Sequence, residues 1–89
     1  MFRFKRNLPI GYDRQGYIYF ASKMYSQLPD HQRKIIRAVC AEAGGEYKEA
    51  VFDFVTTDHG ATQVCMTHHI SESTLERAVR KYYILFPIA

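Results

Sequence analysis

The chain has 89 residues, a hydrophobic content of 47% and a formal net charge of +3. This length allows one domain, near the small end of what folds alone, and the hydrophobic content excludes a disordered protein. The apolar runs are too short for a membrane span or a signal peptide, so we expect a cytoplasmic protein without a membrane partner. Cys40 and Cys65 are then expected to be reduced thiols in the core.

Positive charge is concentrated in the first part of the chain. Residues 1–37 hold eight Lys or Arg and two Asp, residues 38–60 one Lys and five acids, and residues 61–89 three Lys or Arg and two Glu. The densest basic cluster is Arg3, Lys5 and Arg6. These side chains are candidates for contact with a minor groove or with phosphates, and a solvated basic terminus without a binding role is the alternative.

Residues 1–27 are interpreted as an N-terminal arm, and residues 28–89 as a helical domain. Residues 17–20 are Tyr-Ile-Tyr-Phe, a β-prone run, and Asp13 and Gly16 before it suit a turn. This favours an irregular or hairpin arm that leads into a helical turn over residues 21–27. The alternative is a helix over residues 17–27, because Ile18 and Tyr25 also fit one helix face.

Two helices are predicted over residues 31–43 and 46–56. Asp30, after Pro29, is suited to cap the first helix, and Gly44 and Gly45 to end it. Both helices have apolar residues at helical spacing. The two predicted inner faces are Ile35, Ile36, Val39, Cys40 and Ala43, and then Tyr47, Ala50, Val51, Phe54 and Val55. The outer face of the second helix is acidic, so it is expected either to point away from DNA or to bind a protein.

Two more helices, joined by a tight turn, are predicted over residues 59–86. Val64 and Cys65 anchor the first helix, Ile70 fills the turn, and Ser71 is a suitable N-cap for the second. The second helix has one apolar stripe and ends before Pro87. That stripe is Leu75, Ala78, Val79, Tyr82 and Phe86. The fold expected is therefore an all-α bundle of about four helices with a helix-turn-helix at residues 59–86 and a short N-terminal arm.

The same stretch resembles a bacterial helix-turn-helix pattern. Residues 64–65 (Val-Cys), 69–71 (His-Ile-Ser) and 73–75 (Ser-Thr-Leu) are similar to the pattern shared by sigma-factor region four, transposases and phage regulators. Cys65 replaces the usual Ala and His69 the usual Gly, at a position that often needs a positive φ. Residues 28–33, Leu-Pro-Asp-His-Gln-Arg, also resemble the start of sigma-factor region four, although this chain inserts one more helix.

The candidate DNA-binding residues lie on the outer face of the last helix and at its start. Arg can pair with guanine, Lys commonly meets phosphate, and short hydroxyl side chains reach base edges or phosphate. The candidates are Ser71, Ser73, Thr74, Arg77, Arg80 and Lys81. Glu72 and Glu76 reduce the net positive charge of this face. The alternative role for Glu76 and Arg80 is an ion pair with each other. The partner expected is double-stranded DNA, bound with the help of a homodimer or a partner protein.

Other chemistry has weaker support. A zinc site is suggested by the spacings of Cys65, His68 and His69, together with His59. However, Cys65 is needed in the core, and His68 and His69 diverge around the turn. We therefore expect no metal and no cofactor. His68 is expected to face solvent or a phosphate. Asp53, Asp58 and His59 fit caps or surface sites better than catalysis.

The function expected is a small sequence-specific DNA-binding regulator or accessory factor of a bacterium, phage or mobile element. The alternative is a protein-interaction module that uses the helices as scaffold.

Overall fold

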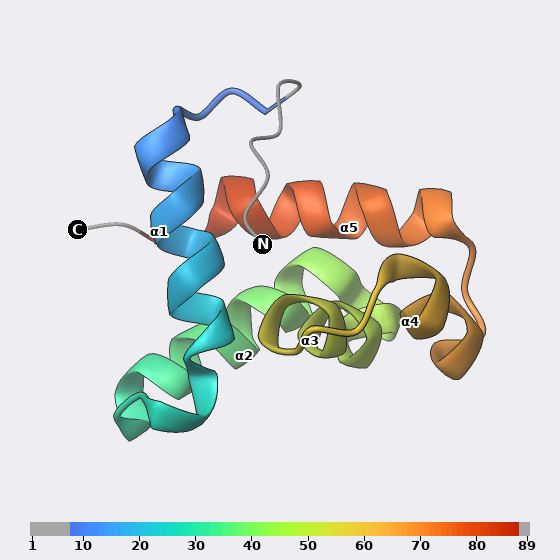
Figure 1. The fold of residues 1–89 in the computed structure, drawn as a ribbon, viewed down its shortest axis with the longest axis horizontal. Helices are drawn as coiled ribbons and strands as arrows, with labels where there is room; N and C mark the ends of the chain where they lie inside the picture. Colours follow the sequence, from blue (N-terminus) through green and yellow to red (C-terminus); the bar gives the residue numbers. More distant parts are fainter. Residues whose placement is uncertain (1–7, 88–89) are drawn as a thin grey trace.

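The computed structural model describes residues 8–87, and in this range the chain forms α-helices and short 3-10 turns without a β-strand. The helices are α1 (Tyr12–Lys23), α2 (Asp30–Gly44), α3 (Lys48–Thr56), α4 (Ala61–His68) and α5 (Glu72–Leu85), and the 3-10 turns are Tyr25–Gln27 and Gly45–Tyr47. The prediction of a small all-α bundle is confirmed. α5 runs along one side of α2 and α3, with α1 across its C-terminal end and α4 beside its N-terminal end (Figure 1).

The N-terminal segment differs from the preferred prediction, because Tyr12–Lys23 is a helix rather than a hairpin or irregular arm. Its buried residues are Gln15, Ile18 and Ser22, so two of three inward positions are polar. Tyr17, on the outside, keeps 57% of its surface exposed. The apolar pattern that normally reveals a helix is therefore missing from the buried face of α1. The alternative helix over residues 17–27 was closer to the structure.

The buried polar groups of α1 are satisfied by specific partners. The Gln15 amide donates to the Ile10 carbonyl at 3.1 Å, and the Ser22 hydroxyl donates to the Ile18 carbonyl at 2.7 Å. The Ser22 Oγ also lies 2.6 Å from the Tyr82 hydroxyl on α5. Because buried polar groups without partners are costly, these bonds permit a helix with a polar inner face to join the core.

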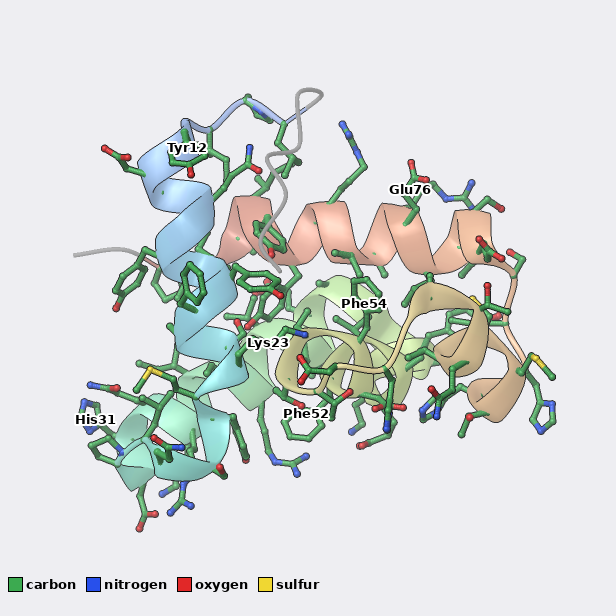
Figure 2. The ribbon with its side chains drawn as sticks, in the orientation of Figure 1. Tyr12, Lys23, His31, Phe52, Phe54 and Glu76 are labelled. Atoms are coloured by element: carbon green, nitrogen blue, oxygen red, sulfur yellow. The ribbon has the colours of Figure 1, made fainter. Side chains whose placement is uncertain are left out.

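Lys23, the last residue of α1, ties this helix to the end of α3. Its ammonium donates to the carbonyl of Phe54 at 3.2 Å and also to the carbonyl of Thr57 (Figure 2). The last carbonyls of a helix have no partner within the helix, so a cation from another element is a suitable cap. Burial lowers the pKa of Lys23, and nearby Asp58 partly offsets this effect.

The ends of α2 follow the sequence signals with one correction. Pro29 occupies the N-cap position, and Asp30 is the first helical residue, where it pairs with Arg33 instead of capping. Gly45, directly after α2, has a φ of 57°, which glycine adopts without strain. The predicted stop at the glycine pair is confirmed. α3 begins at Lys48 rather than at residue 46, because Gly45–Tyr47 is a 3-10 turn.

Most of the predicted core is buried. α2, α3, α4 and α5 all contribute core residues that are at most 2% exposed. These residues are Ile36, Val51, Val64, Leu75 and Tyr82. The predictions for two residues were wrong, since Ile35 and Tyr47 are both 39% exposed. Phe52 and Phe54 are only partly buried and pack on the edge of this core.

Candidate nucleic-acid interface

The turn between α4 and α5 consists of residues 69–71. His69 is left-handed, with φ 58° and ψ 48°, and it alone among the described non-glycine residues has a positive φ. The amide of Ile70 donates to the Cys65 carbonyl at 3.1 Å, and the Ile70 side chain packs on the core. The Ser71 Oγ accepts the amide of Thr74 at 3.2 Å. The predicted tight turn and the predicted N-cap at Ser71 are both confirmed.

The inner faces of the two helices anchor this pair to the bundle. Val64 and Cys65 are buried on α4. The predicted apolar stripe of α5, from Leu75 to Phe86, is buried throughout, and Tyr83 joins it. Since one face of α5 is fixed by packing, its opposite face is turned away from the bundle.

That opposite face presents Ser73, Arg77 and Lys81, all exposed. Their spacing is i, i+4 and i+8, which places them in one row along the helix. Glu76 is also exposed and points away from the bundle on the outer side of α5 (Figure 2). The exposed side of α5 is thus polar, with the cations Arg77 and Lys81 and the acids Glu72 and Glu76.

The hydroxyl groups at the start of α5 are mainly occupied with one another. The Ser71 hydroxyl donates to the Thr74 Oγ1 at 2.8 Å and lies 3.2 Å from the Ser73 Oγ. Thr74 is also half-buried. Ser71 and Thr74 therefore act first as a cap, and Ser73 is the most accessible hydroxyl of the three.

The two acidic residues on α5 differ in their surroundings. Glu72 lies in the first turn, where the helix dipole favours a carboxylate, and accepts the Thr62 hydroxyl of α4 at 3.5 Å. Arg80 is half-buried, in contrast to Arg77.

Two of the upstream basic residues already have partners within the fold. Arg33 is paired with Asp30. Arg37 donates from its Nε to the Tyr25 hydroxyl at 2.9 Å, and its guanidinium lies 4.2 Å from the centre of the Phe52 ring. Arg3, Lys5 and Arg6 lie outside the described residues. Within the described range, α5 carries the best candidate row of cations.

Sequence reasoning missed a cluster of Asp53, His59 and His68. The His59 Nδ1 lies 2.8 Å from the Asp53 Oδ1, and the His68 Nε2 lies 3.0 Å from the Asp53 Oδ2. His68 therefore faces α3 rather than solvent, which corrects our expectation. Burial raises the pKa of Asp53, but hydrogen bonds from His68, His59 and Thr57 outweigh it and leave this pKa below its usual value. The sequence separation of 15 residues between Asp53 and His68 hides the pair from local pattern analysis.

The remaining site predictions concern cysteine, metal and membrane. Cys40 and Cys65 are free and buried, as predicted, and burial raises the pKa of Cys40 to about 12. Within residues 8–87, no group of three or more His, Cys, Asp or Glu side chains is arranged to hold a metal ion. No helix in the described part of the chain is both long enough and apolar enough to cross a membrane.

Comparisons with protein-family models, curated proteins and solved structures found no match to this chain.

Proposed function

We propose that this chain is a small, cytoplasmic, sequence-specific DNA-binding protein, a transcriptional regulator or accessory factor of a bacterium, phage or mobile element. In this proposal α5 enters the major groove of double-stranded DNA. The observation that carries it is the exposed row of Ser73, Arg77 and Lys81 on a helix whose other face is buried. The α4–α5 turn supports it, because that turn leaves the start of α5 at the edge of the bundle (Figure 1).

The three residues of the row have different proposed roles. Arg77 sits in the second turn of α5 and is suited to paired hydrogen bonds with guanine, which would give sequence preference. Lys81, one turn further, is suited to a phosphate, and it would contribute to affinity for any sequence. Ser73 is suited to a base edge or a phosphate near the start of α5.

Binding of a duplex at two salt concentrations tests this function. A labelled duplex pool is titrated with the protein at low and moderate salt, and fluorescence anisotropy reports binding. We expect Arg77→Ala to weaken binding by roughly 1–3 kcal/mol on a preferred site. Lys81→Ala should lower the salt slope by about 1. Lys48→Ala, which removes an exposed cation from α3, is the matched control and should change neither quantity.

Absence of binding by the wild-type protein at low salt would refute the proposal. Equal affinity of wild type, Arg77→Ala and Lys81→Ala would mean that DNA contacts another surface. A random-duplex selection would then identify the preferred site, if binding is retained.

A protein-interaction module is the second candidate, and a groove between α1, α2 and the end of α5 favours it. The groove has a volume of about 370 Å³, and its walls include Tyr17, Ala21, Ile35 and Phe86. Aromatic residues are common at protein interfaces. The two candidates are compatible, because a single module of this size needs a homodimer or a partner protein for tight DNA binding. Sedimentation of the free protein would reveal a homodimer.

A further inference from the structure

The first helix has large apolar side chains on its outer side. Its buried face includes the polar residues Gln15 and Ser22. Its opposite face carries Tyr17, Phe20 and Met24, which are 57%, 57% and 48% exposed. Their spacing of three and four residues places them in one row along the helix, which we call the α1 ridge. Because large apolar side chains gathered at a surface mark interaction sites, the α1 ridge favours a further contact on its outer side.

A groove lies directly beside the α1 ridge. It has a volume of about 370 Å³, and its lining includes Tyr17 and Ala21 of α1, Ile35 of α2 and Phe86 after α5. The rings of Tyr17 and Phe86 meet edge-on, with 6.4 Å between their centroids, so the end of α5 supports the wall between ridge and groove. The surface therefore has a convex part and a concave part next to each other.

A convex row beside a concave groove suits a two-fold symmetric contact between identical chains. In such a contact both copies use the same patch, so that residue i of one copy meets residue j of the other, and j meets i. The α1 ridge of one copy can therefore lie in the groove of the second copy, while the ridge of the second copy lies in the groove of the first.

The charges around this surface also suit a second copy of the same chain. On α1, Asp13 and Arg14 lie one turn before Tyr17. On α2, Asp30 and Arg33 pair with each other in the stretch that lines the groove. These charges cancel, so two copies do not repel each other here. A nucleic acid or a strongly charged peptide would gain no attraction from this surface.

The exposed apolar area sets the expected strength of the contact. An aromatic side chain buries roughly 150–250 Å² when it is fully covered, so Tyr17 and Phe20 at 57% exposure each still offer roughly 85–140 Å². With Met24 and Ile35, the surface falls in the range of functional patches on monomers, about 300–600 Å². A standard interface needs about 800 Å² from each partner, part of it polar. The surface is thus sufficient for a dimer that exchanges with the monomer, but too small for an obligate dimer.

We propose that this chain forms a two-fold symmetric homodimer through the α1 ridge and the groove beside it, with a dissociation constant on the order of 1–100 µM. This inference deepens the proposed function, on whose interaction groove it rests, by naming a second copy as the occupant. The contact lies at the C-terminal end of α5, which α1 crosses (Figure 1). Ser73 is about 20 Å along the helix from Phe86, at a rise of about 1.5 Å per residue, so the contact is far from the start of α5.

Sedimentation equilibrium of the wild-type protein between about 1 and 500 µM, a range that spans the expected dissociation constant, tests the dimer. We expect the mean mass to rise from the monomer value of 10.4 kDa towards twice that value. Met24→Lys puts a charge into the apolar contact twice, once from each copy, and should weaken dimerisation at least about tenfold.

Met66→Lys is the matched control. Met66 is 73% exposed on α4, which lies at the other end of α5 (Figure 1). Both methionines lie at or near a helix C-terminus, where a cation is favourable, so both variants are expected to fold. Met66→Lys has the same net charge as Met24→Lys, and it should leave the dissociation constant within about twofold of wild type.

Ile35→Lys, on the α2 side of the groove, is a second variant and should also weaken dimerisation at least about tenfold. Thermal unfolding followed by circular dichroism shows whether each variant is folded. A constant mass of 10.4 kDa at every concentration would overturn the inference. Dimers of wild-type strength in both folded variants, Met24→Lys and Ile35→Lys, would overturn it as well.

NMR spectra of the backbone amides, recorded with dilute and concentrated wild-type protein, locate the contact. We expect the signals that depend on concentration to belong to residues 17–24 and 31–36. Changes confined to the outer face of α5 would contradict the proposed surface.

The inference and the DNA-binding function can fail separately, because these measurements contain no DNA. Arg77→Ala, which tests DNA binding, should dimerise like wild type. If the protein dimerises through α1 and binds no duplex, DNA binding is wrong and the dimer stands. If the protein binds a duplex and stays monomeric without it at every concentration, the inference alone is wrong.

Discussion

The Ser22 hydroxyl on α1 lies 2.6 Å from the Tyr82 hydroxyl on α5, across 60 residues of sequence. Tyr82 is fully buried and Ser22 is 2% exposed. Ser22 also donates to the Ile18 carbonyl, so its single proton is used there and the Tyr82 hydroxyl is the donor to Ser22. This chain of two hydrogen bonds joins the N-terminal helix to the helix that carries the proposed DNA-binding row.

Ser22→Ala should therefore destabilise the fold more than Tyr82→Phe. The first change leaves a buried Tyr hydroxyl without a partner, at about 1–3 kcal/mol, whereas the second removes the donor and leaves Ser22 bonded to Ile18, at about 1 kcal/mol. Thermal unfolding followed by circular dichroism measures both, with about 4–8 °C expected per kcal/mol in a domain of this size. Tyr17→Phe, on the exposed side of α1, is the control. Equal stability of Ser22→Ala and wild type would contradict this account.

The same residues explain which part of the fold the sequence could predict. α5 has an apolar stripe in which Leu75, Val79 and Tyr82 recur at helical spacing, so its position and inner face were predicted correctly. α1 buries Gln15 and Ser22 and exposes Tyr17, so the spacing of apolar residues did not predict its inner face. Its inward polar groups are satisfied partly by Tyr82, a residue too distant in sequence for pattern analysis to connect.

The candidate site also has a part that the sequence predicted and a part that it did not. The turn at His69 and the cap at Ser71 depend on local backbone geometry, and local residue types indicated both. The contact between Asp53 and His68 depends on how α3 packs against α4. Periodicity locates the buried face of each helix but not the relative rotation of two helices, so a polar contact between them stays hidden.

Alkaline pH should destabilise the protein through its buried tyrosines. Burial raises the pKa of Tyr83 from its usual value near 10 to about 12, and it also raises the pKa of Tyr82. A raised folded-state pKa contributes stability that is fully present below about pH 10 and is lost as pH rises towards the folded value. Urea unfolding at pH 8, 10 and 11 should show this loss. The loss should be smaller in Tyr83→Phe, and an equal loss in that variant would assign it to other groups.

Acid should weaken the fold through Asp53. Its pKa in the folded protein lies below the usual 3.8, because the bonds from His68, His59 and Thr57 outweigh the opposite effect of burial. A lowered folded-state pKa contributes stability that is present above about pH 3.8 and is lost as pH falls through the folded value. Asp53→Asn should therefore lose stability at pH 6 and show a shallower decline below pH 4. Asp58→Asn, outside the cluster, is the control and should leave the contribution of the cluster intact.

Replacement of His69 tests the turn that precedes α5. A non-glycine residue in the left-handed region costs roughly 1–2 kcal/mol. Glycine avoids this cost but gains about 0.4–1 kcal/mol of chain entropy in the unfolded state. His69→Gly should therefore be more stable than wild type by about 0.8 kcal/mol, as the difference of these two effects. His69→Val, with a β-branched side chain, should be less stable than wild type. Chemical unfolding of the three proteins gives the order, and a Val variant as stable as the Gly variant would show that residue 69 does not need the left-handed conformation in solution.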